Sequence, residues 1–179
     1  MESQSSSLPQ IKLKIAQIED KSHILHLMND NANLIGGYDR EKFEIAGSYV
    51  LQDIDNGFFI LAYEDRSEIL NNQEEQSSSS DPNSNIIPAG FMFFTYEWSD
   101  WRNGLFFWMQ SCHVTQDYRK AGVFNKMCEF LQQYMKDQGC CGLRLNAEVR
   151  LDEMWAPIVK KLGMKQTHYY IYDIDASTN

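Results

Sequence analysis

A short basic turn that leads into a helix is the segment best suited to bind an anionic ligand. A strand-like run ends at Val114, the turn carries Arg119, Lys120 and Gly122, and a helical pattern begins at Val123. The N–H groups of a helix's first turn are unpaired and carry partial positive charge, so they accept a phosphate or pyrophosphate. The two basic side chains add charge, and the glycine lets a ligand approach the backbone. A plain connection with solvated charges is the alternative.

The elements that must position this turn follow from the spacing of apolar residues and from turn signals. Alternating apolar residues predict strands, and apolar residues three and four apart predict helices. Asn103-Gly104 predicts an antiparallel hairpin between two strands. The predicted elements are a strand at 11–15, helices around 24–28 and over 40–53, strands over 57–63, 89–98 and 105–114, a helix over 122–138, a strand over 143–149, a helix over 152–162 and a strand over 166–173. The order β-α-α-β-β-β-α-β-α-β indicates a mixed α/β fold.

These elements are expected to form a single domain over residues 10–175, behind a polar tail at 1–9. The stretch 65–88 is rich in Asn, Gln, Glu and Ser, including four consecutive serines. Such a composition buries too little apolar surface to offset the entropy of ordering it. We therefore expect a flexible loop inserted between two strands.

Composition narrows the class of protein. A net charge of −9 and a pI near 4.8 disfavour nucleic acid as the main partner. They are compatible with a cationic substrate. There is no signal-peptide pattern and no apolar run of membrane-spanning length, so we expect a cytoplasmic protein without a membrane partner. The four cysteines have neither a zinc-site nor a disulfide-framework spacing, so no metal is expected. Neighbours on a strand point to opposite faces, which disfavours a Cys112–His113 dyad.

The basic turn and its surroundings resemble the GNAT superfamily, the GCN5-related N-acetyltransferases. The turn reads Arg119-Lys120-Ala121-Gly122-Val123-Phe124, similar to the superfamily's Gln/Arg-x-x-Gly-x-Gly/Ala, with Phe124 in place of the last small residue. Further segments look like a small-molecule-type branch of these enzymes. They are Thr95–Gly104, Phe107–Ser111, Gly142–Leu145, Lys161–Met164 and Thr167–Tyr170. The resemblance is specific over about residues 87–173.

The resemblance implies a mostly antiparallel sheet, splayed between its two middle strands and flanked by helices. The strand from Gln110 to Val114 would bulge and part from the strand starting at Leu143, and the pantetheine of acetyl-CoA would lie in the gap. It would bond to the backbone of Cys112, His113 and Val114. The pyrophosphate would rest on amides from Arg119, Lys120, Ala121, Gly122, Val123 and Phe124. Homodimers are common in the superfamily.

The implied reaction is acetyl transfer from acetyl-CoA to a primary amine of a small molecule by direct attack. An alkylamine with a pKa of about 10.4 is protonated at neutral pH, so a base must remove a proton first. Glu97, near the end of a hairpin strand, is the first candidate, with a solvated charge as its alternative role. Glu148 is the second, with ion pairing to an arginine as its alternative. His113 could also serve, or be a hydrogen-bonded core histidine.

Two features leave the activity and the acceptor open. The superfamily often has a tyrosine four residues before the Lys-Leu-Gly glycine, where this chain has Val159. A non-catalytic acyl-CoA-binding or interaction module on the same fold is therefore the alternative function. Trp98, Trp101 and Trp108 are predicted to form an aromatic cluster, either in the core or as a cation–π wall for an amine. Tyr170 could contribute to the same wall.

Overall fold

The computed structural model describes residues 9–36, 39–67, 85–147, 152–172, 174 and 176. The chain divides into a larger unit, Met1–Asn146, and a smaller unit, Ala147–Asn179. The single domain predicted over 10–175 stays a prediction. Most of the predicted tail and of the loop predicted over 65–88 lies outside the described residues. None of the helices among the described residues is long and apolar enough to cross a membrane.

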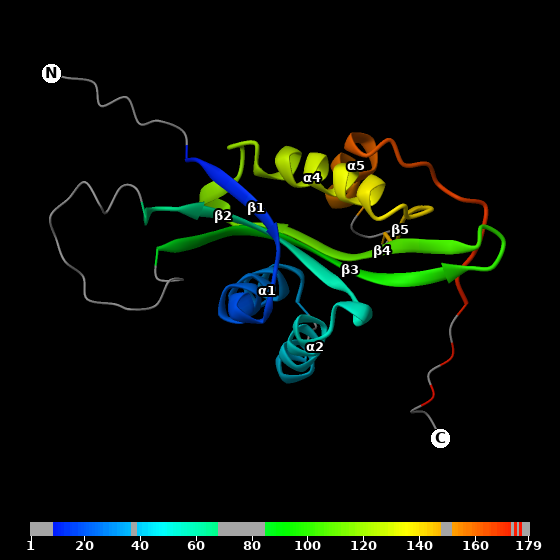
Figure 1. Ribbon diagram of the computed structural model, residues 1–179, viewed down its shortest axis with the longest axis horizontal. Coiled ribbons are helices and arrows are strands. Elements are labelled where there is room, and N and C mark those ends of the chain that lie inside the picture. The colour runs from blue at the N-terminus through cyan, green and yellow to red at the C-terminus, as the bar shows by residue number, and fades with distance from the viewer. Residues whose placement is uncertain are drawn as a thin grey trace, which may run out of the picture. The chain divides into compact units, whose positions relative to one another are not determined.

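The larger unit is built on one five-stranded sheet whose strands lie in chain order, β1-β2-β3-β4-β5. Strands β1 to β4 are antiparallel, and β5 lies parallel to β4 after a crossover through α4 (Figure 1). The elements are β1 (Ile11–Ile15), η1 (Ile18–Asp20), α1 (Lys21–Ile35), α2 (Arg40–Gln52), η2 (Ile54–Asn56), β2 (Phe58–Asp65), β3 (Ile86–Ser99), β4 (Gly104–Val114), η3 (Gln116–Tyr118), α4 (Val123–Asp137) and β5 (Gly142–Leu145). The mixed α/β fold and the hairpin predicted from Asn103-Gly104 are confirmed.

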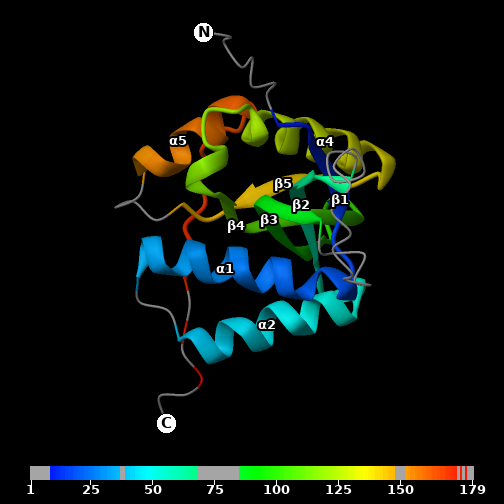
Figure 2. The ribbon, with the colours of Figure 1, turned by 90° about the vertical axis from the view of Figure 1, so that its left-hand side faces the viewer.

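Helices cover both faces of this sheet. Figure 2 shows α1 and α2 on one face and α4 on the other. Because strand side chains alternate, each face has its own apolar set. On the α1 and α2 face, Ile24, Leu27 and Met28 of α1 share a buried cluster with Phe59 and Phe91 of the sheet.

On the α4 face, the core is built from aromatic rings. Phe58 lies between three of them, stacked on Phe94 with centroids 4.7 Å apart and edge-on to Phe107 at 4.9 Å. Tyr134 of α4 completes the group, 5.1 Å from Phe58. Such offset and edge-to-face pairs are favourable beyond the area that they bury. They fix α4, and with it the turn that precedes α4, against the sheet.

A β-bulge interrupts the pairing of β3 with β4. Phe94 pairs with Met109, but the preceding residue, Phe93, pairs with Ser111. Met109 and Ser111 are two positions apart in β4, whereas their partners are adjacent in β3. Gln110 is therefore an extra residue of β4 that has no partner in β3. The bulge predicted from the resemblance to begin at Gln110 is present.

The bulge changes which residues of β4 face which helices. Before it, Phe107 contacts Tyr134 of α4, so Gln110, like other even-numbered positions, faces α1 and α2. After it, the odd-numbered His113 contacts Asp30 of α1. The face opposite α4 therefore receives Gln110 and the odd-numbered residues that follow.

The smaller unit contains α5 (Asp152–Lys161), which confirms the predicted helix over 152–162 to within a residue. The strand predicted over 166–173 is wrong for the described residues, which are irregular from Met164 to Tyr172. Tyr169, Tyr170 and Tyr172 expose 76%, 83% and 89% of their surface. Strand propensity largely reflects burial on one face and pairing with a neighbour, and these residues have neither.

Candidate functional site

Strand β4 loses its neighbour β5 halfway along its length. The two strands pair only where Phe106–Met109 lies beside Gly142–Leu145. From Gln110 to Val114, the described part of the chain pairs β4 with β3 alone. Apart from the Val114 carbonyl, which accepts from Arg119, the backbone groups on the other edge of this stretch pair with no strand among the described residues and can bind a ligand. This is the parting expected there. Cys112, His113 and Val114 lie on this stretch of β4, and their contact with pantetheine stays a prediction.

The turn before α4 has the features of an anion site. Gly122 precedes the helix with φ of 78°, a left-handed conformation suited to glycine. No side chain caps the helix, and the first intrahelical bond is from Lys126 N–H to the Gly122 carbonyl. The amides of Val123 and Phe124 therefore have no acceptor within the helix. A side chain built on Gly122 would meet nothing within 4 Å, so the approach is open.

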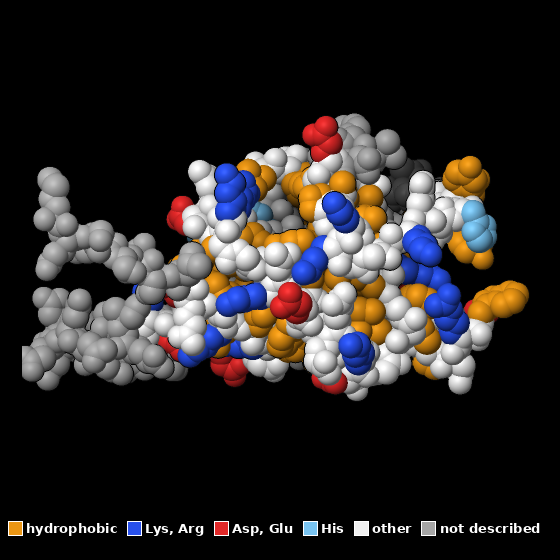
Figure 3. Space-filling view, turned by 90° about the horizontal axis from the view of Figure 1, so that it is seen from above, with side chains coloured by type: hydrophobic (Ala, Val, Ile, Leu, Met, Phe, Trp, Pro, Cys, Tyr) orange, Lys and Arg blue, Asp and Glu red, His pale blue; other side chains and the backbone are white. Residues whose placement is uncertain are grey.

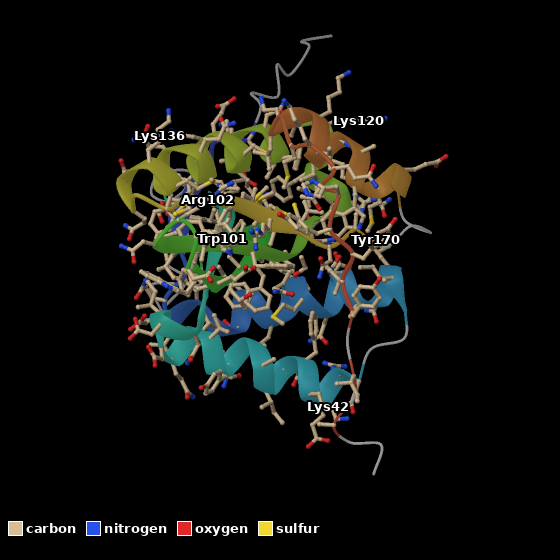
Figure 4. All side chains as sticks on the ribbon, turned by 90° about the vertical axis from the view of Figure 1, so that its right-hand side faces the viewer. Lys42, Trp101, Arg102, Lys120, Lys136 and Tyr170 are labelled. Atoms are coloured by element: carbon tan, nitrogen blue, oxygen red, sulfur yellow. The ribbon has the colours of Figure 1, made fainter. Side chains whose placement is uncertain are left out.

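The two basic residues of the turn are held differently. Arg119 donates from Nε to the carbonyl of Val114 at 3.1 Å, which ties the turn to the end of β4. Lys120 adopts φ of 66°, a left-handed conformation that costs a non-glycine residue about 1–2 kcal/mol. Its side chain is exposed, and Figure 4 shows it near the start of α4. Figure 3 shows Lys and Arg side chains spread over this side of the molecule.

A buried carboxylate anchors the same turn to β2. Tyr118 donates its hydroxyl to Glu64, which also accepts from Arg66 at 3.1 Å. Both Tyr118 and Glu64 are buried, with exposures of 8% and 9%. Burial alone would raise the pKa of Glu64, but the two hydrogen bonds outweigh it and leave that pKa lowered. Burial and the bond to Glu64 raise the pKa of Tyr118 to about 12.

Glu97, the first predicted base, forms an ion pair with Arg144 of β5. The Arg144 guanidinium also lies over the Phe106 ring, 4.1 Å from its centroid. The second carboxylate oxygen of Glu97 is enclosed and has no partner among the described residues. Glu97 pairs with Phe106 across the strands, four residues or ~13 Å from the bulge at Gln110.

Glu148, the second predicted base, lies outside the described residues. Its predicted role stays a prediction.

The predicted aromatic cluster on the hairpin is wrong. Trp98 and Trp101 expose 60% and 94% of their surface, so neither is a core residue. Trp98 belongs to the α4 face of β3, whereas Trp108 lies on the opposite face. Figure 4 shows Trp101 at the hairpin turn beside Arg102. Tyr170, the third predicted substrate residue, is an exposed residue of the smaller unit.

Polar side chains lie around the bulge on the α1 side, and of these sequence reasoning proposed a role for His113 alone. Gln110 donates from Nε2 to the Thr95 hydroxyl at 2.8 Å. The hydroxyl of Ser111 is buried and has no hydrogen-bond partner among the described residues. His113 Nε2 lies 2.7 Å from an Asp30 carboxylate oxygen. The strand pattern indicated the place of Gln110 and Ser111, but nothing in the sequence links Asp30 to a residue 83 positions away.

Cys112 is not a nucleophile paired with His113. Burial, with the nearby Cys128 thiol, raises the pKa of the Cys112 thiol well above its usual range. A low pKa is what activates a cysteine, so this thiol is inert.

Comparisons with solved structures give the fold. A possible acetyltransferase from Clostridium difficile 630 matches with a TM-score of 0.72 and 25% identity, over 93% of this chain and 97% of that one. The chain has the fold of the GNAT acetyltransferases. The aminoglycoside acetyltransferase AAC(6')-Iy, bound to the bisubstrate analogue CoA-S-monomethyl-acetylneamine, matches with a TM-score of 0.64 and 15% identity, over 93% and 98% of the two chains.

A ribosomal-protein-alanine N-acetyltransferase from Brucella melitensis biovar Abortus 2308 matches this GNAT-fold chain with a TM-score of 0.66. Its identity is 14%, over 92% of this chain and 98% of that one. No family model and no curated relative matches the sequence. At these identities, the assignment of function has to come from the site itself.

Proposed function

We propose that this GNAT-fold chain is an N-acetyltransferase that transfers the acetyl group of acetyl-CoA to a primary amine of a small molecule. The observation that carries the proposal is the coincidence of two open binding features at one end of β4. There, the parted strand edge from Gln110 to Val114 adjoins the uncapped N-terminus of α4 at Gly122. The first suits an extended amide-containing chain, and the second suits a pyrophosphate. Acetyl-CoA has both parts, in this order.

The residues of this end take distinct roles in the proposal. The backbone of Cys112, His113 and Val114 would hold the pantetheine, and a free N–H of the strand would stabilise the oxyanion. The amides of Val123 and Phe124 would hold the pyrophosphate, with Arg119, Lys120, Ala121 and Gly122 forming the turn around it.

The chemistry needs no covalent enzyme intermediate. The ammonium first gives one proton to a base. The freed amine nitrogen then attacks the thioester carbon, the C–S bond breaks, and a second proton from the nitrogen reaches the departing thiolate. A thiol of pKa about 8.5 leaves with little help, so Val159 at the superfamily's usual tyrosine position does not preclude turnover. The carboxylate bases predicted from the sequence, Glu97 and Glu148, stay predictions, and Glu97 is already paired with Arg144.

A small-molecule amine is the proposed acceptor. Two of the similar structures hold aminoglycoside-related compounds, a CoA–neamine bisubstrate analogue in one and sisomicin in the other. The net charge of −9 also favours cationic over anionic acceptors.

Binding and turnover are tested separately. Acetyl-CoA and CoA should each raise the melting temperature, and acetyl-CoA should release thiol with at least one member of a panel of diamines, polyamines and aminoglycosides. Arg119→Glu should weaken binding of acetyl-CoA, whereas Lys136→Glu, the same charge change at the far end of α4, should not. No stabilisation by either nucleotide would refute the proposal. Binding without turnover of any amine would favour the non-catalytic module.

A further inference from the structure

His113, in the stretch of β4 that has parted from β5, has one ring nitrogen, Nδ1, that its hydrogen bond to Asp30 does not use. His113 Nε2 lies 2.7 Å from Asp30 Oδ2, and the His113 side chain is only 4% exposed. A carboxylate at this distance fixes the tautomer, so that the proton sits on Nε2 and the lone pair on Nδ1. No described residue donates to Nδ1. A buried imidazole oriented by a carboxylate, with its second nitrogen unbonded, is the arrangement of a general base.

The position of His113 in the strand suits that task. His113 and Ser111 lie on the face opposite α4, two residues or ~7 Å apart, and Ser111 adjoins the bulge. Acyl-CoA in the strand parting would be approached by an amine from this side. Glu97 is ~13 Å from the bulge and is already paired with Arg144.

Two enclosed polar atoms on the same elements have no partner among the described residues. They are the Ser111 hydroxyl of β4 and the Asn31 amide nitrogen of α1, in side chains that are 8% and 4% exposed. Buried polar groups are nearly always hydrogen-bonded, to ordered water or ligand where the protein supplies no partner. Asn31 follows Asp30 directly in α1. These two groups, on the same two elements as His113 and Asp30, are therefore available to water or an amine.

Two charged groups act on His113, one from each side. Burial lowers the pKa of His113, the Asp30 carboxylate of α1 raises it, and the Arg119 guanidinium of the turn before α4 lowers it, with a lowered value as the net result. The third neighbour, Phe91 of β3, is uncharged, with its ring centroid 6.3 Å from the imidazole. The imidazole is consequently neutral at pH 7. A bound pyrophosphate would neutralise Arg119 and make His113 more basic.

We propose that His113, oriented by Asp30, accepts the proton from the acceptor amine on Nδ1. The inference rests on the proposed acetyl transfer and adds its base. The ammonium gives one proton to Nδ1, the freed amine attacks the thioester carbon, and the second proton follows the departing thiolate. His113 then returns its proton to solvent. Asp30 is a positioning residue, because it acts only through the imidazole.

Kinetics of thiol release test this assignment with the best amine of the panel. His113→Asn should lower kcat by about 10²-fold or more, while KM for acetyl-CoA changes less than about threefold. Asp30→Asn should have a smaller effect and should shift the acidic limb of the pH profile of kcat/KM. His26→Asn, an exposed histidine on the same helix as Asp30, is the matched control and should behave as the unaltered protein.

Full kcat in a folded His113→Asn protein would overturn the inference, and so would a loss confined to Glu97→Gln. If His113→Asn does not fold, His113→Gln and the following titration decide the question.

Histidine titration by NMR needs no acceptor amine. The ring signals of the chain's four histidines are followed with pH, with and without saturating CoA, and His113 is assigned by its loss in the variant. CoA should raise the pKa of His113 and leave that of His26 unchanged. CoA that binds without moving the pKa of His113 would overturn its coupling to Arg119 and, with it, the inference. CoA that does not bind would instead refute the proposed function.

Discussion

Removal of the Tyr118 hydroxyl is the sharpest probe of how the turn before α4 is held. Tyr118→Phe keeps the ring in its buried position and deletes only the donor to Glu64. Arg66 still donates to Glu64 in the variant, so the carboxylate keeps one partner. The change therefore measures a single buried hydrogen bond to a charged group.

The magnitude of this bond follows from the charge of its acceptor. A hydrogen bond to a charged group contributes about 1.5–3 kcal/mol to stability. The pKa of Tyr118, which burial and this bond raise from its ordinary value of 10.0 to about 12, agrees in direction. We therefore expect Tyr118→Phe to lower the free energy of unfolding by about 2 kcal/mol, or the Tm by about 4–8 °C for a chain of this size.

The pH dependence identifies the source of the loss. The folded pKa of Tyr118 lies above the unfolded value, so the contribution is complete below about pH 10 and disappears as the pH rises to about 12. The folded pKa of Glu64 is lowered, so the contribution also decreases as the pH falls below about 4.5. The difference between the two proteins should thus be largest between these limits.

Chemical denaturation of four proteins provides the measurement. Tyr118→Phe, Glu64→Gln and the double variant form a cycle with the unaltered protein, and Tyr49→Phe, an exposed tyrosine, is the control. The coupling between the first two changes should be about 2 kcal/mol. If the anchor positions the turn, Tyr118→Phe should also raise KM for acetyl-CoA more than it lowers kcat. Additive single effects, or a loss that is constant from pH 7 to 12, would refute the reasoning.

Three further substitutions test other parts of the fold, each by its effect on Tm and on the free energy of unfolding. Lys120→Gly should stabilise the chain by about 0.5–1 kcal/mol, because relief of the left-handed conformation exceeds the entropy cost of glycine; a destabilised variant would contradict this. Gly57→Ala should destabilise by about 2 kcal/mol or more, since the new methyl group would lie 2.3 Å from the Phe94 carbonyl oxygen at φ of 150°; an unchanged Tm would show that the strands yield there. Phe107→Ala should cost about 3–5 kcal/mol, because its ring contacts Phe58 and Tyr134 in the core; a loss under 1 kcal/mol would mean that this core collapses around the gap.

Local patterns were sufficient to predict most of the larger unit. The hairpin followed from Asn103-Gly104 and its flanking strands, and α4 from apolar residues at helical spacing. The turn at Arg119 followed from the same local signals. These features depend on contacts between residues close in sequence, where periodicity and turn chemistry are informative.

Features that depend on distant residues were not predictable in the same way. The strand expected over 166–173 had the right alternation but no pairing neighbour among the described residues. The partner of Glu97 is Arg144, and that of His113 is Asp30, each far away in sequence. Such pairs are fixed by the register of the strands and by the packing of a helix on the sheet. Neither the register nor the packing can be read from a local pattern in a single sequence.

The bulge at Gln110 decides which side chain of β4 meets Asp30. If β4 paired with β3 regularly beyond Met109, Gln110 would oppose Phe93 and each later residue would move one place, so that Cys112 would face α1 and His113 would face α4. Deletion of Gln110 would not cause this exchange, because Met109 and Ser111 would then be adjacent, as their partners Phe94 and Phe93 are. A histidine and a thiol that alternate along one strand are thus assigned to opposite sides of the sheet by the register of the strand and not by their order. A shift of register by one residue is consequently a more direct route to a different chemistry here than a change of residue type.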